Sequence, residues 1–295
     1  MDFKNFIDEC SKTIVGNQKN IKLSISAIIS EGSILIEDYP GTGKTTFAKT
    51  ITYNLGLDFK RIQFTSDLLP ADILGYNFFK GEQSLFQKGP IFTNVVLADE
   101  LNRGSAKSQS AFLEAMEEKN VTIDGETYKL PEPFFVIATQ NPMDSSGTSL
   151  LPDSQLDRFM ISFSLAELNS DQKKQVLKNN ISFEHIKKSN INWNDIKKQK
   201  DQIKVNENVF EYILNIESFI NKLNKDFYIS PRCLKQISEL AKGWALIDER
   251  DYVTHQDVKE ILPSILRHRI RFLNNEKEKI NFINSEILDK IVIPK

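Results

Sequence analysis

The chain has 295 residues, enough for two domains of ordinary size, each with its own hydrophobic core. Hydrophobic residues make up 40% and charged residues 26%, as in an ordinary globular protein, and no apolar run is long enough to cross a bilayer, so we expect no membrane insertion. The net charge of -2 argues against a dedicated nucleic-acid-binding protein, because such proteins need a basic excess to release counterions.

The cysteines and the first residues favour a cytoplasmic protein. Cys10 and Cys233 lie far apart and belong to no C-x-x-C pair, which predicts reduced thiols rather than a zinc site or a disulfide framework. The segment Met1–Cys10 contains acidic residues and lacks the basic start and apolar run of a signal peptide, so we expect no secretion. The one compact basic cluster, RHRIR at Arg267–Arg271, would spread around a helix, which predicts a solvated face.

Three short apolar runs predict buried strands: SILIE at Ser33–Glu37, NVVLAD at Asn94–Asp99 and PFFVIATQ at Pro133–Gln140. Runs of this length suit strands that are covered on both faces, as in a parallel sheet between helices. Between the runs, hydrophobic residues recur three or four positions apart, which predicts helices, one of them ending at Gly56. The alternation predicts an α/β fold with a parallel sheet sandwiched by helices.

The pattern changes near Asn190, after which segments such as VFEYILNIESFINKL space their apolar residues as in helices. We predict an α/β domain over residues 1–188 and a smaller all-helical domain over residues 189–295. The first domain also contains a predicted β-hairpin, because Asp124-Gly125 is a two-residue turn signal that places Val121 opposite Tyr128. We expect this hairpin to project from the core as an insertion.

The stretch DYPGTGKT matches the phosphate-loop pattern G-x-x-x-x-G-K-[ST], except that Asp38 stands at the first glycine. The groups that hold phosphate lie downstream: the backbone N–H groups of residues 41–45, the Lys44 ammonium, the Thr45 hydroxyl and the helix N-terminus behind them. We therefore expect the loop to form, with the Asp38 side chain turned back onto the local backbone. The motif follows a buried strand and opens a helix, which predicts nucleotide binding.

Two other predicted strands end in side chains suited to phosphate chemistry. Asp99 can hold Mg²⁺ or its waters, and Glu100 follows where it could polarise an attacking water. The third strand ends in Gln140-Asn141, amides that can hydrogen-bond a γ-phosphate and the attacking water. Each group alone is also typical of a solvated strand end. Together with the phosphate loop they predict hydrolysis of a nucleotide.

The motifs resemble those of the MoxR family of AAA+ ATPases. The stretches that carry the resemblance, in chain order, are GTGKTT, FKRIQFTSDLLPADILG, KGPIF, LADELNR, QSAFLEAMEE, VTIDGETYKLPEPFFVIATQNP, LPDSQLDRF, SPRCLKQISELAKGWALIDERDYVTHQDV and ILRHRI. They cover most of the chain and leave mainly residues 165–225 without a distinctive motif. The resemblance implies a P-loop AAA+ core with a β-hairpin insertion and a C-terminal helical lid, and EDxPGxGKT resembles a variant of the loop seen in this family.

The resemblance also implies roles for single residues in binding and hydrolysing ATP with Mg²⁺. Asp99 would be the Walker B metal ligand, Glu100 the hydrolytic base and Asn141 the sensor of the γ-phosphate. Arg158 would be the arginine finger inserted into a neighbouring subunit's site, and Arg232 the second sensor, carried by the lid. The remaining nucleotide contacts would come from the adenine segment at Val15 and Gly16 and from Walker A, namely Gly41, Thr42, Gly43, Lys44, Thr45 (also a Mg²⁺ ligand) and Thr46.

The resemblance implies a chaperone-like ATPase that forms a ring, with six subunits in this family, and that remodels or matures partner proteins. Some of these partners carry a von Willebrand factor A domain. The Val121–Tyr128 hairpin resembles the helix-2 insertion of this branch and would contact partners. Two alternatives stay open: a nucleotide-switched binding module that performs no mechanical work, and a nucleic-acid motor of the related helicase branch. A GTPase is disfavoured, because NKLNKDF lacks the aspartate of N-K-x-D.

Overall fold

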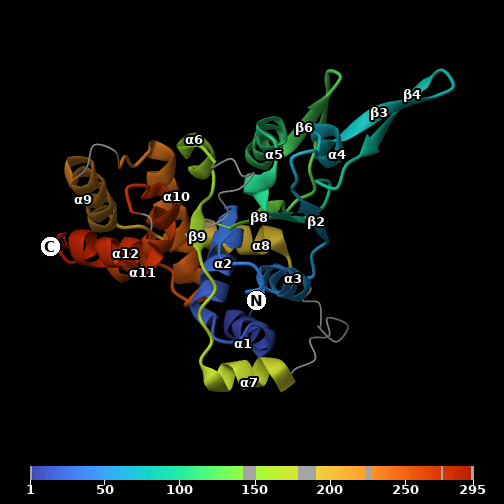
Figure 1. Ribbon diagram of the computed structural model, residues 1–295. Coiled ribbons are helices and arrows are strands. Elements are labelled where there is room, and N and C mark those ends of the chain that lie inside the picture. The colour runs from blue at the N-terminus through green and yellow to red at the C-terminus, as the bar shows by residue number, and fades with distance from the viewer. Residues whose placement is uncertain (1, 142–150, 179–190, 224–226, 274, 294–295) are drawn as a thin grey trace.

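The computed structural model describes residues 2–141, 151–178, 191–223, 227–273 and 275–293. At its centre is a parallel five-stranded sheet with the strand order β2-β5-β8-β1-β9 (Figure 1). Its strands are β1 (Ile34–Glu37), β2 (Phe59–Gln63), β5 (Val95–Asp99), β8 (Phe135–Gln140) and β9 (Ile161–Phe163). The three predicted strands are confirmed as β1, β5 and β8, whereas the two edge strands, β2 and β9, were not predicted.

Helices cover both faces of the sheet. Successive residues of a strand point to opposite faces, so each central strand contributes side chains to two cores. Ile34 and Ile36 of β1 belong to the core that packs against α1 (Phe3–Thr13), α2 (Gln18–Ile29) and α3 (Lys44–Asn54). Leu35, between them, belongs to the core on the other face, which packs against α4 (Pro70–Leu74), α5 (Ala106–Glu118) and α6 (Asp153–Leu156). The central strands are thus buried on both sides, which explains their continuous apolar runs.

Two β-hairpins project together from the side of the sheet that carries α4 and α5 (Figure 1). The predicted hairpin is confirmed as β6 (Asn120–Ile123) and β7 (Glu126–Lys129), with Val121 paired to Tyr128. A second hairpin, β3 (Gly75–Lys80) and β4 (Gln83–Lys88), was not predicted. The two are joined by the stacked rings of Phe86 and Tyr128, whose centroids are 4.1 Å apart, and by a 2.7 Å hydrogen bond from Asn77 to Asp124.

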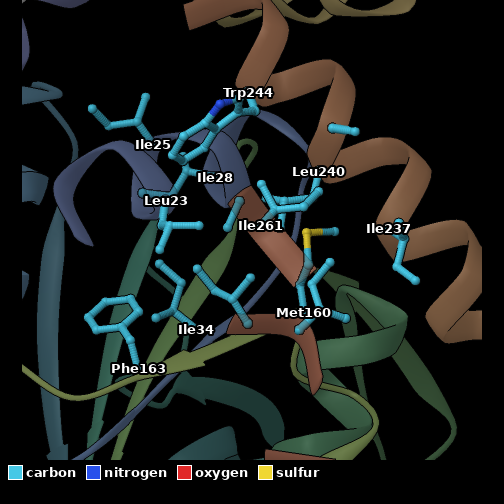
Figure 2. Packing of buried hydrophobic residues seen from close by; sticks show 14 of the residues in the cluster. Leu23, Ile25, Ile28, Ile34, Met160, Phe163, Ile237, Leu240, Trp244 and Ile261 are labelled. Carbon is cyan, nitrogen blue, oxygen red and sulfur yellow. The ribbon is translucent and has the colours of Figure 1, made fainter. Parts of the chain in front are cut away.

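The C-terminal part is helical, as predicted, and packs against α2. Its elements are α8 (Trp193–Asp201), α9 (Glu207–Leu223), α10 (Pro231–Ile247), α11 (His255–Leu266), the 3₁₀ turn η2 (Arg267–Arg269), α12 (Glu276–Asn281) and the π-helical segment η3 (Phe282–Leu288). Figure 2 shows Leu240 and Trp244 of α10 beside Ile25 and Ile28 of α2, in one core that continues to the sheet. The predicted boundary between residues 188 and 189 lies outside the described residues.

α7 (Ser170–Lys178) lies between the sheet and this helical part in the sequence. Within the described ranges, no helix is both long and apolar enough to cross a membrane.

Candidate functional site

The carboxyl ends of β1, β5 and β8 lie along one edge of the sheet, which we call the carboxyl edge. Glu37, the last residue of β1, is paired with Gln140, the last residue of β8. Because β8 lies between β1 and β5, the loops that follow these strands are neighbours. Open α/β sheets bind their ligands at this edge. The structure therefore brings the phosphate loop, Asp99, Glu100 and Asn141 together.

The phosphate loop, residues 38–45, leads directly into α3. Gly41 and Gly43 have φ angles of +80° and +96°. Apart from the glycine itself and its two chain neighbours, no atom of the described residues lies within 4 Å of the place where a Cβ would stand on either of them. Gly43 occupies the N-cap position, so no side chain caps the helix that begins at Lys44 and continues through Thr45 and Thr46. The loop thus leaves an open cradle in front of the first N–H groups of α3, which fits the phosphates of a nucleotide.

Lys44 lies within the field of the acidic groups at this edge. Its ammonium donates hydrogen bonds to the carbonyl oxygens of Asp38, at 2.9 Å, and Tyr39, at 2.6 Å. Burial lowers the pKa of Lys44, and the negative charges of Asp38, Asp99 and Glu100 oppose that shift. A half-buried ammonium in the field of two strand-end carboxylates is positioned to meet a phosphate, while the carboxylates are placed to meet its metal ion.

The Asp38 carboxylate points back into the protein, as expected. One oxygen accepts from the backbone N–H of Tyr39 at 2.8 Å, and the other accepts from the N–H of Leu165 at 3.0 Å. The second bond was not predicted, because its donor lies beyond β9, far along the chain. Asp38 is buried, at 7% exposure, and it ties the start of the phosphate loop to the segment after β9.

Asp99 is held at the end of β5 by two residues that were not predicted. The hydroxyl of Thr139, on β8, donates to one carboxylate oxygen at 2.5 Å, and Nε of Arg61, on β2, donates to the other at 2.9 Å. No group of three or more His, Cys, Asp or Glu side chains in the described ranges could hold a metal ion. A Mg²⁺ ion at Asp99 and Thr45 would therefore need phosphate oxygens and water as its other ligands, as is usual for this ion.

Glu100 adopts a left-handed conformation, with φ 54° and ψ 46°, just before the 3₁₀ turn η1 (Leu101–Arg103). This backbone is costly for a residue with a side chain and is found mainly where surrounding contacts impose it. Here the Glu100 N–H donates to the Thr139 hydroxyl at 2.9 Å. Its carboxylate accepts from Nε2 of Gln63 at 2.9 Å and pairs with Nε of Arg103 at 3.2 Å. Gln63 and Arg103 thus both hold the Oε2 atom of Glu100, at the edge where the loop lies.

The two amides at the end of β8 have different surroundings. Gln140 donates to the Glu37 carboxylate at 2.5 Å, so its amide group serves the sheet. Asn141 is the next residue, and its main-chain carbonyl oxygen accepts from Nδ2 of Asn102 at 3.5 Å. Of the predicted pair, the Gln140 amide is thus bound within the sheet, and Asn141 stays the residue predicted to sense a phosphate.

The predicted adenine segment packs against the stretch that follows β9. Gly16 has a φ of +75°, and a Cβ there would stand 3.0 Å from the Gln172 amide, on α7. The Asn17 side chain donates to the carbonyl of Val15 at 3.0 Å and accepts from the N–H of Ala166 at 2.9 Å. Since Leu165 is bound to Asp38, Val15 and Gly16 are tied to the phosphate loop through the segment after β9.

The two predicted arginines lie at the opposite edge of the sheet, which we call the amino edge. Arg158 precedes β9, and two residues later the N–H of Met160 donates to the carbonyl of Ser33, just before β1. Nε of Arg158 is 3.0 Å from the Glu117 carboxylate, and Arg232, at the start of α10, pairs with the same carboxylate. The structure thus separates Arg158 and Arg232 from the phosphate loop and brings them together.

The prediction of a solvated face for the RHRIR cluster is wrong for Arg267–Arg269, whereas Arg271 is exposed. Arg267 and His268 are buried, and Arg269 reaches inward to pair with Asp157 at 3.0 Å. Arg267 donates to the hydroxyl of Ser164 at 3.1 Å and to the carbonyl of Glu37 at 3.3 Å. The segment forms a 3₁₀ turn wedged between the lid and the sheet, and the helical spacing assumed from sequence does not apply to it.

Two family models match the chain, the ATPase family associated with various cellular activities (AAA) over residues 33–161 and the AAA lid domain over residues 218–291. The chain is 33% identical to the chaperone MoxR1 of Mycobacterium tuberculosis over 279 residues, which cover 90% of this chain and 74% of that protein. The chain belongs to the MoxR family of AAA+ ATPases. This chain is also 36% identical over 272 residues to the protein YeaC of Bacillus subtilis, covering 90% of this chain and 85% of the relative.

The fold agrees with that of a solved relative. A crystal structure from Cytophaga hutchinsonii, of a protein proposed to be an ATPase, superposes on this chain with a TM-score of 0.86 and 36% sequence identity. The match covers 100% of this chain and 95% of the other. The parallel sheet, the flanking helices and the helical lid are thus those of the AAA+ fold.

Proposed function

We propose that this MoxR protein binds ATP with Mg²⁺ at the carboxyl edge and hydrolyses it. The phosphate loop and Lys44 would hold the phosphates, while Thr45 and Asp99 would hold the metal ion, which neutralises phosphate charge when bound. Glu100 would take a proton from the attacking water, and Asn141 would hydrogen-bond the γ-phosphate. Val15 and Gly16 would line the adenine site.

We propose further that hydrolysis requires a neighbouring subunit. The observation that carries this proposal is the position of Arg158 and Arg232 at the amino edge, across the sheet from Lys44 and Asp99. In a ring, the amino edge of one subunit can face the carboxyl edge of the next, where an arginine stabilises the charge that develops on the γ-phosphate. A closed ring is the simplest arrangement in which every site is completed in this way, and a hexamer is our proposed form.

The proposed work of the ring is to remodel partner proteins. The relative MoxR1 is named a chaperone. The paired hairpins offer a surface for such partners, because β3 and β4 expose Tyr76, Phe78, Phe79 and Leu85, with Phe79 at 78% exposure. A protein with a von Willebrand factor A domain is one proposed partner class. The cytoplasmic location and the domain boundary at residues 188–189 remain predictions.

Complementation between two inactive variants tests the proposed site. Lys44→Ala lacks a working phosphate loop, and Arg158→Ala lacks the finger that it would offer to its neighbour. In mixed rings, the intact loop of an Arg158→Ala subunit can meet the intact finger of a Lys44→Ala subunit, so we expect the ATPase rate to rise above that of either variant alone. The matched control mixes the double variant Lys44→Ala/Arg158→Ala with Lys44→Ala. Its ATPase rate should stay at the baseline, because no subunit in that mixture has an intact phosphate loop. If the mixture of Lys44→Ala and Arg158→Ala shows no ATPase rate above the baseline, with mixed assemblies confirmed by size, the proposal of a shared site is overturned.

A further inference from the structure

Glu117 binds both of the arginines that the proposed function assigns to a neighbour's nucleotide. Its side chain lies in the last turn of α5, which has 13 residues and therefore spans about 20 Å, from the turn after Glu100 to the amino edge. One carboxylate oxygen is 3.0 Å from Nε of Arg158, and the other pairs with a terminal nitrogen of Arg232. Three elements that are distant in sequence thus meet at one carboxylate.

Glu117 holds Arg158 at Nε, which leaves the two terminal nitrogens of the guanidinium available to another partner. Glu117 contacts Nε, and the two terminal nitrogens of Arg158 make no hydrogen bond or ion pair to any residue in the described ranges. Those terminal nitrogens lie in the fixed plane of the guanidinium and can donate two parallel hydrogen bonds to a phosphate. The side chain is 27% exposed, and that of Arg232 is 42% exposed, so both reach the surface.

Charge explains why a carboxylate is needed there. Two guanidinium groups brought side by side repel each other, and Glu117 between them offsets this repulsion while leaving one net positive charge on the three groups. The other acid nearby, Asp157, cannot replace it. Its carboxylate is already bound by Arg269 at 3.0 Å and by the Ser230 hydroxyl at 2.8 Å, and it is 4.0 Å from Arg232.

We propose that Glu117 is a positioning residue that holds Arg158 and Arg232 together as one phosphate-binding pair, presented to the nucleotide of the adjacent subunit. This rests on the proposed function, in which the arginines act across an interface. Glu117 itself touches no nucleotide. Its loss would leave each guanidinium free to move, and misplacing a group that stabilises a transition state by about 1 Å can cost up to about a hundredfold in rate.

The test uses full-length Glu117→Gln, which keeps the shape of the side chain and removes its charge. We expect its ATPase rate at saturating ATP to fall about tenfold or more, because both arginines lose their orientation. Binding of a fluorescent ATP analogue by its own phosphate loop should be unchanged, because that loop lies at the other edge. Glu118→Gln is the matched control, since the Glu118 side chain is exposed and makes no hydrogen bond or ion pair within the described residues. It should keep the parental rate.

Mixing Glu117→Gln with other variants shows which edge of the subunit carries its defect. Glu117→Gln should be rescued by Lys44→Ala, which supplies intact arginines, and should not be rescued by Arg158→Ala, which is damaged at the same edge. Adding Glu117→Gln to Arg158→Ala/Arg232→Ala should slow the enzyme no further, because the residue acts only through those arginines.

The outcomes separate the two proposals. A parental rate for Glu117→Gln, rescue by Arg158→Ala, or a further loss in the triple variant would overturn the role of Glu117 while leaving the shared site standing. If Arg158→Ala and Lys44→Ala fail to complement each other in confirmed mixed rings, the shared site itself fails, and the role of Glu117 is overturned with it.

Discussion

The Asp38 carboxylate shows how a residue that breaks a motif can be part of the structure that supports it. Both of its oxygens accept backbone hydrogen bonds, from Tyr39 and from Leu165, so its charge is satisfied away from the phosphate cradle. A carboxylate in this position is compatible with phosphate binding because its oxygens are already used. The loop therefore depends on Asp38 for its shape and not for contact with a ligand.

This geometry changes the expected effect of Asp38→Gly. The ATP affinity of the folded protein should be close to that of the parent, because the phosphate-binding groups lie downstream. The free energy of unfolding should fall by about 1–3 kcal/mol, because two partly buried N–H groups lose a charged acceptor. Urea unfolding and titration with an ATP analogue measure the two effects separately, with the exposed Asp58→Gly as control. A large loss of affinity without a loss of stability would contradict this account.

His268 gives the protein a predicted sensitivity to acid. It is buried in η2, with Nε2 3.2 Å from the Phe159 carbonyl oxygen. Burial, followed by the positive charge of Arg269, lowers its pKa well below the ordinary 6.5. Below about pH 6.5 the histidine of the unfolded chain binds a proton, whereas the buried His268 of the folded chain stays neutral. The free energy of unfolding therefore falls as the pH falls, by up to about 1.4 kcal/mol per pH unit.

The variant His268→Gln can keep a donor to Phe159 and removes the titration. Its urea midpoint should therefore fall less than that of the parent between about pH 7 and about pH 5.5, across the window just below the ordinary histidine pKa. Equal losses in the two proteins would show that His268 does not cause the acid sensitivity.

At the level of elements, the strands that could be predicted are those that are buried along all or nearly all of their length. β5 and β8 are buried along nearly their whole length, so the apolar run is the signal. β2, FKRIQ, is an edge strand with exposed Lys60 and Arg61, and β9 has only three residues, so neither carries such a run. The β3–β4 hairpin was missed because three of its aromatic residues, Tyr76, Phe78 and Phe79, are exposed to solvent, which sequence patterns do not predict.

The same distinction applies to the site. Asp99, Glu100 and Asn141 could be predicted because each directly follows a recognisable strand. Gln63 and Thr139 could not, because they act on those acids only through the pairing of strands that are distant in sequence. The shared partner of the two arginines, and their distance from the phosphate loop, likewise depend on how three separate segments pack.

The contact between α10 and α2 depends on a glycine. A Cβ on Gly243 would stand 2.7 Å from the carbonyl oxygen of Ser26 and 2.8 Å from the hydroxyl of Ser30, so the helices can approach this closely only without a side chain. In an exposed helix, Gly→Ala would stabilise by up to about 1 kcal/mol. Here we expect Gly243→Ala to destabilise the protein by about 1–3 kcal/mol through overpacking.

Thermal or urea unfolding measures that effect, and Lys235→Ala, at an exposed position of the same helix, should change stability by less than about 0.5 kcal/mol. A stabilised Gly243→Ala protein would mean that the two helices can separate at little cost. The lid would then be a loosely attached unit rather than part of the core shown in Figure 2.

For the whole molecule, the continuous core between lid and sheet has a consequence for assembly. Arg232, on the lid, and Arg158, beside the sheet, are carried on one packed body. If the subunits meet as proposed, the phosphates bound at one subunit's carboxyl edge attract both arginines of the next. The nucleotide would then act as a bridge, and its binding would strengthen the ring.

We therefore expect Glu100→Gln, which should bind ATP with Mg²⁺ and hydrolyse it very slowly, to form larger assemblies with the nucleotide than without it. Adding Arg158→Ala and Arg232→Ala to this variant should weaken assembly, because the bridge is lost, while a single subunit should still bind ATP, because its phosphate loop is untouched. Analytical ultracentrifugation with a fluorescent ATP analogue follows both properties in one sample. Arg271→Ala, which removes an exposed arginine of the lid paired to Asp153, is the control for loss of positive charge. Identical size distributions for Glu100→Gln with and without the two arginine substitutions would show that the ring is held by other contacts.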